Sequence, residues 1–167
     1  GVRKSRPLVV RRSLTSGVKL HVKYWVPRKT HHRLHTIGRR SKIEREARQY
    51  QRFERAGLPV ADYVFSGVRR LAGPRGIYLT GVVVTRSVEG SCDLRALRRA
   101  GAEPWIRHGR DASGEMMAEL GDLLARVHRC NLIHGDFMLK NILYCSGGTE
   151  VPYRMIDLAS GWTVKRG

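Results

Sequence analysis

Two short apolar segments joined by a turn constrain the fold of this chain most. They cover residues 142–144 and 153–156, and the stretch between them contains Ser-Gly-Gly-Thr, which is typical of a β-hairpin connection. Asp136 and Asn141 precede the first segment, and Asp157 follows the second. Neighbouring strands of a hairpin run in opposite directions, so the pattern places two carboxylates and one carboxamide at the same end of the two strands.

These three side chains match the needs of phosphoryl transfer. That reaction requires an acid to orient the attacking hydroxyl, and oxygen ligands for the magnesium ions that neutralise the phosphates. Asp136 fits the first role, whereas Asn141 and Asp157 fit the second. Either aspartate alone would be an ordinary turn residue, but their joint occurrence with His134 and Asn141 between apolar strands predicts a catalytic site.

The charge of the chain is large and unevenly distributed. Its 167 residues carry 32 Lys and Arg against 14 Asp and Glu, which gives a net charge of +18. Residues 1–55 hold 17 of these cations and three acids, a balance of +14. Such a field favours polyanions, among them nucleic acid, anionic lipid headgroups and phosphorylated glycans, although a solvated basic surface would have the same composition.

Cysteine usage and hydropathy predict the compartment. The three cysteines (Cys92, Cys130 and Cys145) are far apart and lack the spacing of a zinc or redox motif, which favours a reducing compartment. No stretch reaches the ~20 apolar residues of a membrane-spanning helix, and the basic N-terminus lacks the apolar segment of a signal peptide. We therefore expect a cytoplasmic protein, with peripheral attachment to the inner face of the cytoplasmic membrane as an alternative.

The N-terminal part of the chain predicts two strands, at residues 8–12 and 18–25, joined by a turn at 13–17. The second strand alternates apolar and polar side chains, so that Lys23 lies on the side opposite to its apolar residues, Val18, Leu20, Val22 and Tyr24. Residues 27–40 are polar and basic and include His31, His32 and His35. A solvated loop explains these histidines better than a metal site, because no carboxylate lies nearby.

A helix is predicted from Ser41, as its N-terminal cap, to about Ala56, where Gly57 and Pro59 end it. Its apolar stripe consists of Ile43, Ala47, Tyr50 and Phe53. Glu46 lies within this stripe, and an acid on a buried face needs a cationic partner. Lys23 is the natural candidate for that partner.

Two further strands, at residues 58–68 and 77–88, are predicted to complete a small sheet around a turn at 73–76. A short helix at 93–99 and a long helix from Ser113 to Arg129 follow. The long helix is expected to bury one face and to place both Met116 and Met117 in the core. Its predicted buried face comprises Met117, Leu120, Leu123, Leu124 and Val127.

With Lys23, Glu46, Asp136, Asn141 and Asp157 in this order, the chain resembles the lipopolysaccharide kinase family, the heptose and Kdo kinases of the Gram-negative envelope. The resemblance spans about residues 8–162. It implies an α+β, protein-kinase-like fold of two lobes. Residues 1–88 would form a small antiparallel sheet with the helix at about 41–56, and residues 89–167 a mainly helical C-lobe shorter than a complete one.

The resemblance also implies an activity and a site. It implies an ATP-dependent kinase that phosphorylates a hydroxyl of a heptose or Kdo sugar in the lipopolysaccharide core, with Mg²⁺ as cofactor. Asp136 would be the catalytic base, assisted by Asn141. Asn141 and Asp157 would bind magnesium, and Asp157 together with the Lys23–Glu46 pair would hold the nucleotide. The acceptor would be an anionic glycolipid at the membrane surface.

Other readings of the same motifs stay open. The sequence His-Gly-Asp at residues 134–136 also resembles the RIO- and Bud32-type atypical protein kinases, for which the basic segment would contact nucleic acid, and the aminoglycoside-type phosphotransferases. A basic binding module of the pseudokinase type is a further alternative. It would suit the glycine-poor segment before Lys23, where Thr15-Ser16-Gly17 is the only candidate for a phosphate loop.

Overall fold

The computed structural model describes residues 8–25, 41–73, 76–107, 109–145 and 151–164. They divide into two compact units. The first comprises Gly1–Gln51 and Asp62–Ser87, and the second comprises Arg52–Ala61 and Val88–Gly167. The basic loop predicted at 27–40, with its three histidines, lies outside the described residues, as does part of the turn predicted at 73–76.

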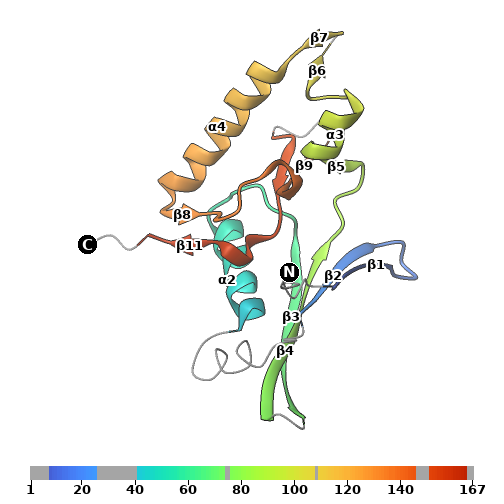
Figure 1. The fold of residues 1–167 in the computed structure, drawn as a ribbon, viewed down its shortest axis with the longest axis vertical. Coiled ribbons are helices and arrows are strands. Elements are labelled where there is room, and N and C mark those ends of the chain that lie inside the picture. Colours follow the sequence, from blue (N-terminus) through green and yellow to red (C-terminus); the bar gives the residue numbers. More distant parts are fainter. Residues whose placement is uncertain (1–7, 26–40, 74–75, 108, 146–150, 165–167) are drawn as a thin grey trace, which may run out of the picture. The chain divides into compact units, whose positions relative to one another are not determined.

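In its described residues, the first unit is a four-stranded antiparallel sheet with helix α2 packed on it (Figure 1). The strand order is β1-β2-β4-β3. Its elements are β1 (Leu8–Ser13), β2 (Lys19–Trp25), α2 (Lys42–Arg55, whose last residues belong to the second unit), β3 (Tyr63–Gly73) and β4 (Gly76–Arg86).

Helix α2 begins with a capping box. The Glu44 backbone N–H donates to Ser41 Oγ at 3.1 Å, and the Ser41 N–H donates to Glu44 Oε2 at 2.7 Å. The two bonds satisfy two backbone donors that a helix start leaves without partners. The predicted cap at Ser41 is therefore confirmed, and Glu44 is a partner that the prediction did not include.

Close packing of α2 on the sheet depends on a glycine. A Cβ built on Gly81 of β4 would lie 2.8 Å from the Gly67 carbonyl oxygen and 3.0 Å from an Ile43 side-chain carbon of α2. Gly81 pairs with Trp25 of β2, which is buried and shares a sheet face with Lys23. The helix therefore covers the face that carries Lys23, and the absence of a side chain at Gly81 lets it approach.

Besides the last residues of α2, the described part of the second unit contains helices α3 and α4, short strands and 3₁₀ turns (Figure 1). Its elements are β5 (Ser91–Asp93), α3 (Leu94–Ala100), β6 (Ile106–Arg107), β7 (Arg110–Asp111), α4 (Ser113–Arg129), β8 (Leu132–Ile133), η1 (Leu139–Asn141), β9 (Ile142–Cys145), β10 (Tyr153–Met155), η2 (Leu158–Ser160) and β11 (Trp162–Thr163). In the part of the chain that the structure describes, no helix is both long and apolar enough to cross a membrane.

The predicted hairpin forms the centre of this unit. Strand β9 pairs antiparallel with β10 and with β5, whereas β8 pairs with β11. Side chains from α4 and the hairpin make up much of the core. The buried residues include Met116, Leu120, Leu123, Val127, Ile142 and Met155.

Two details of the sequence prediction are wrong. Met117 is 57% exposed, because the buried face of α4 passes through Met116, Leu120 and Leu123. The third strand of the sheet begins at Tyr63 rather than at residue 58, because residues 59–61 bond to Met155 of β10 instead. Residues 59–61 have the apolar character of a strand, but a local sequence pattern does not specify which strand such a segment pairs with.

Candidate active site

The first part of the site is an ion pair in the first unit. Lys23 Nζ on β2 lies 2.8 Å from Glu46 Oε1 on α2, and the two side chains are 13% and 2% exposed. The predicted pairing of these residues is thus formed. A buried carboxylate is costly unless it is paired. The pair therefore fixes the lysine ammonium at one position on the face of the sheet that α2 covers.

Replacing Lys23 by methionine is expected to destabilise the fold by about 3 kcal/mol, because a buried charge loses its partner. The double variant Lys23→Met/Glu46→Gln should lose less stability than the sum of the two single variants. Urea unfolding measures both quantities. The matched control is Lys19→Met on the same strand, where the side chain is exposed. An equal loss in both lysine variants would contradict the role of the pair.

The second part of the site is the loop before β9, where Asn141 fixes Asp136. Asn141 is buried at the end of η1. Its Nδ2 donates to the Asp136 backbone oxygen at 2.9 Å and to Asp136 Oδ2 at 2.9 Å. One carboxamide thereby holds both the main chain and the carboxylate of Asp136, which remains partly accessible. A carboxylate held in this way can accept a proton from a hydroxyl placed against its other oxygen.

Asp157 stands at the end of β10, next to this loop. The Ile156 backbone N–H donates to the Asn141 carbonyl oxygen at 2.9 Å, which continues the β9–β10 ladder. Asp157 then adopts a left-handed backbone conformation, with φ 57° and ψ 56°. Left-handed conformations of residues other than glycine are uncommon and gather at functional sites. The structure thus brings Asp136, Asn141 and Asp157 to one end of the hairpin.

These residues fit a divalent cation by their chemistry. The amide nitrogen of Asn141 is engaged by Asp136, so its amide oxygen is the atom that would ligate a cation, together with the carboxylate of Asp157. Both are hard oxygen ligands of the kind Mg²⁺ prefers. Within the described residues, no group of three or more His, Cys, Asp or Glu side chains is placed to hold a metal. Mg²⁺ commonly keeps water and phosphate oxygens as its remaining ligands.

The buried side chain of His134 packs against the loop that carries Asp136. The imidazole is 1% exposed and makes edge contacts with Phe53 and Phe137. The Asp136 N–H points to His134 Nδ1 at 3.4 Å, so Nδ1 is the acceptor of the neutral ring. Burial lowers the pKa of His134 below its ordinary value, although the Ile156 carbonyl and the two nearby aspartates oppose the shift. His134 is therefore a buried packing residue that contacts the main chain at Asp136.

The depressed pKa of His134 makes stability depend on pH. Between about pH 6.5 and the lower pKa of the folded state, the unfolded chain takes up a proton that the folded chain does not, so stability falls as pH falls. Urea unfolding at pH 7, 6 and 5 should show that His134→Gln loses less stability between pH 7 and pH 5 than the parent chain does. His128→Gln, at an exposed histidine of α4, should keep the parent slope, and equal slopes for all three proteins would refute the assignment.

Sequence reasoning missed Lys140. Its Nζ lies 3.7 Å from Asp136 Oδ2, four residues along the chain, and the lysine is exposed. The i,i+4 spacing from an acid was the available signal. In a chain with 32 Lys and Arg, that signal does not distinguish one lysine from another.

The candidate phosphate loop is a tight hairpin turn. The Gly17 N–H donates to the Leu14 carbonyl at 2.9 Å, and the Leu14 N–H donates to the Val18 carbonyl at 2.9 Å. Gly17 has a φ of 79°, which glycine adopts without strain. Residues 14–18 therefore connect β1 to β2 directly.

A small antiparallel sheet with a buried lysine–glutamate pair, followed by a hairpin that carries the acids, defines the protein-kinase-like class of folds. The chain belongs to the Lipopolysaccharide kinase (Kdo/WaaP) family, whose sequence profile matches residues 3–165. A sequence search of curated proteins finds no match.

Among solved structures, one described as "WaaP in complex with acyl carrier protein" is similar to this chain, with a TM-score of 0.64 and 15% sequence identity. The alignment covers 96% of this chain and 63% of that one, so this chain spans less than two thirds of the length of its structural neighbour. At this identity the likeness concerns the fold. The predicted α+β, protein-kinase-like fold is confirmed.

Proposed function

We propose that the protein is an ATP-dependent kinase that transfers a phosphoryl group to a sugar hydroxyl of the lipopolysaccharide core. The observation that carries this proposal is the clamp on Asp136, in which Asn141 Nδ2 bonds to both the carboxylate and the main chain at 2.9 Å. Phosphoryl transfer is catalysed mainly by positioning and electrostatics. Membership in the lipopolysaccharide kinase family supports the choice of acceptor.

Each residue takes a role in this proposal. Asp136 orients the acceptor hydroxyl and accepts its proton. Asn141 and Asp157 hold Mg²⁺, which supplies charge neutralisation for the phosphates. Lys23, fixed by Glu46, contacts the nucleotide phosphates as a point charge. Lys140, beside Asp136, adds a cation where negative charge develops on the transferred group.

The charge of the chain suits this acceptor. A net charge of +18 favours approach to a glycolipid that carries phosphates and acidic sugars. The proposal therefore includes peripheral attachment of the chain at the inner face of the cytoplasmic membrane, where it would reach such an acceptor.

Phosphate transfer from labelled ATP with Mg²⁺ tests the proposal. Three acceptors are offered: dephosphorylated core containing heptose, core reduced to Kdo, and a generic protein. Transfer to either core would support the proposed function, and the choice between them would identify the sugar. Transfer to protein alone would favour the RIO- or Bud32-type alternative. Absence of transfer and of nucleotide binding would favour the pseudokinase alternative.

A further inference from the structure

One face of the sheet in the first unit is apolar and is not the face that α2 covers. In the sheet register, Val10, Val22, Val84 and Phe65 form one cross-strand row, and Leu8, Tyr24 and Val82 form the next. Cross-strand partners share a face, and these rows lie opposite to Lys23 and Trp25, where α2 packs. We call this side the outer face.

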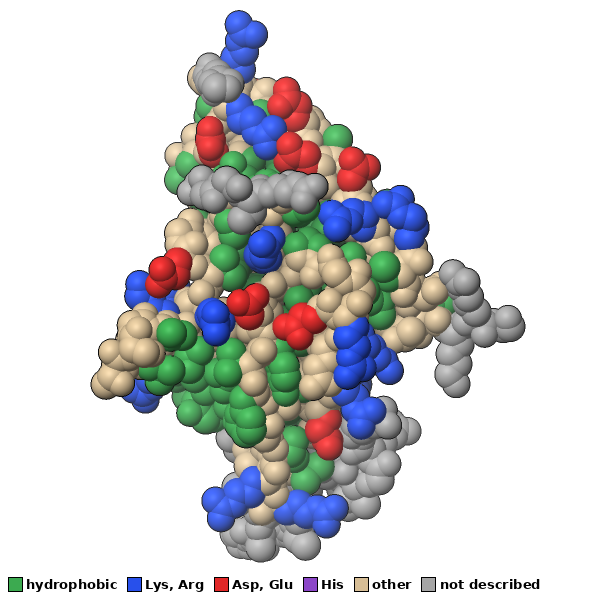
Figure 2. Space-filling model, turned by 180° about the vertical axis from the view of Figure 1, so that it is seen from behind, with side chains coloured by type: hydrophobic (Ala, Val, Ile, Leu, Met, Phe, Trp, Pro, Cys, Tyr) green, Lys and Arg blue, Asp and Glu red, His purple; other side chains and the backbone are tan. Residues whose placement is uncertain are grey.

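Large apolar side chains of the outer face reach solvent. Leu8 is 63% exposed, Phe65 55% and Tyr24 44%. The Phe65 ring lies over Gly67, where an added Cβ would come within 3.1 Å of its Cζ atom, so it lies along the sheet. Figure 2 shows hydrophobic side chains gathered over the part of the molecule that holds β1 and β2. Grouped exposed apolar side chains mark a binding surface rather than ordinary exposure.

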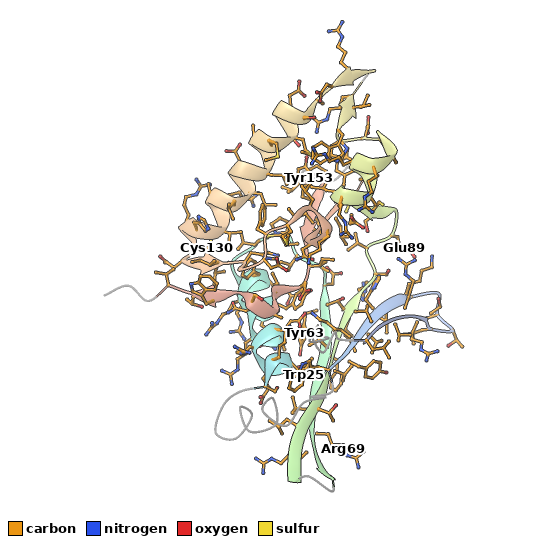
Figure 3. The ribbon with its side chains drawn as sticks, viewed as in Figure 1. Trp25, Tyr63, Arg69, Glu89, Cys130 and Tyr153 are labelled. Carbon is orange, nitrogen blue, oxygen red and sulfur yellow. The ribbon has the colours of Figure 1, made fainter. Side chains whose placement is uncertain are left out.

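The charge of the sheet is of one sign. Its four strands contain seven Lys and Arg residues and no Asp or Glu. Three exposed arginines belong to the outer face, by the same register. Arg12 and Arg86 flank the apolar rows at one end, and Arg69 flanks them at the other, toward the end of the β3–β4 hairpin (Figure 3).

We propose that the outer face docks on an anionic lipid bilayer. Apolar and aromatic side chains in the middle of the face would enter the region between headgroups, and the arginines at both ends would pair with lipid phosphates. The absence of carboxylates from the four strands means that no like charge on them opposes this contact. The inference rests on the peripheral attachment included in the proposed function and assigns it to one face of the sheet. Its test is separate from phosphoryl transfer, since bilayer binding needs neither nucleotide nor catalysis.

Sedimentation of the full chain with vesicles, without nucleotide, tests the proposal. We expect binding to vesicles that contain phosphatidylglycerol to be at least tenfold tighter than binding to pure phosphatidylcholine, and to weaken as salt rises. The double variant Leu8→Ser/Phe65→Ser should bind about tenfold more weakly. Its control is Met117→Ser/Ile106→Ser, which removes two exposed apolar side chains of the second unit and should bind as the parent does.

A second pair of variants, which both lose two positive charges, tests the arginines. Arg12→Gln/Arg69→Gln should weaken binding several-fold more than Arg95→Gln/Arg129→Gln, which alters two exposed arginines of α3 and α4. Circular dichroism melts show whether each variant folds. Equal losses in both arginine pairs, or equal binding to both lipids, would overturn the proposal. Saturable binding to a soluble acidic protein without binding to vesicles would also overturn it. None of these results depends on whether the chain transfers phosphate.

Discussion

Replacing Asp136 with asparagine is expected to lower the rate of phosphate transfer by about a thousandfold or more, because a positioned general base contributes roughly 10²–10⁴. The replacement keeps the size of the side chain, and the Asn141 amide still has the backbone oxygen of residue 136 as an acceptor. The fold should therefore persist, as urea unfolding and circular dichroism would show. The rate is measured in single turnovers with labelled ATP.

The control for Asp136→Asn is the same substitution at an exposed aspartate outside the site. Asp122 is exposed on α4 in the same unit, so Asp122→Asn removes the same charge without touching the loop. It should leave the transfer rate within about twofold. Unchanged turnover in Asp136→Asn, with the fold intact, would end the assignment of Asp136 as the base.

Replacing Gly135 with alanine is expected to destabilise the second unit by about 3 kcal/mol or more. A Cβ at this position would lie 2.0 Å from the Ser160 carbonyl oxygen, and the backbone φ is +77°. The left-handed conformation costs an alanine about 1–2 kcal/mol. In addition, the overlap with a main-chain oxygen would force either the loop after β8 or the turn η2 to move. Thermal and urea unfolding measure the loss.

A second glycine provides a control for which the opposite change in stability is expected. Gly121 lies within α4, and an added Cβ there meets no atom within 4 Å. Gly121→Ala should stabilise the chain by up to about 1 kcal/mol, since alanine is the better helix former. If both variants unfold at the parent's midpoint, the close approach at Ser160 does not constrain the loop.

Gly135 also shows how far the sequence predicts this site. The spacing of His134, Asp136, Asn141 and Asp157 was sufficient to predict the hairpin, and the apolar stripe of α2 was sufficient to predict the partner of Lys23. The conformation of Gly135 was not predictable, because it depends on Ser160, a residue 25 positions away in the sequence. Long-range approach of two main chains has no local pattern.

The other differences between prediction and structure arise because long-range packing decides which residues pair and which are buried. Residues 59–61 have the apolar character of a sheet strand, but they bond to Met155 of the hairpin. On α4 both Met116 and Met117 were expected in the core, whereas the structure buries Met116 and exposes Met117. A helix whose two adjacent residues are both methionine gives equal weight to either face at that position, and only the packed neighbours decide.

The hydrogen bonds of Asn141 explain why an amide rather than an acid suits this position. An aspartate would offer a stronger ligand for a divalent cation. It would also bring a second carboxylate to within hydrogen-bond distance of Asp136, and two such groups share a proton, which raises one of their pKa values. When both carboxylates are ionised, their like charges would repel, and residue 141 would no longer anchor the base. The carboxamide avoids this conflict, because its nitrogen end anchors the base and its oxygen end remains a neutral ligand, so catalysis and cation binding do not compete for the same charge.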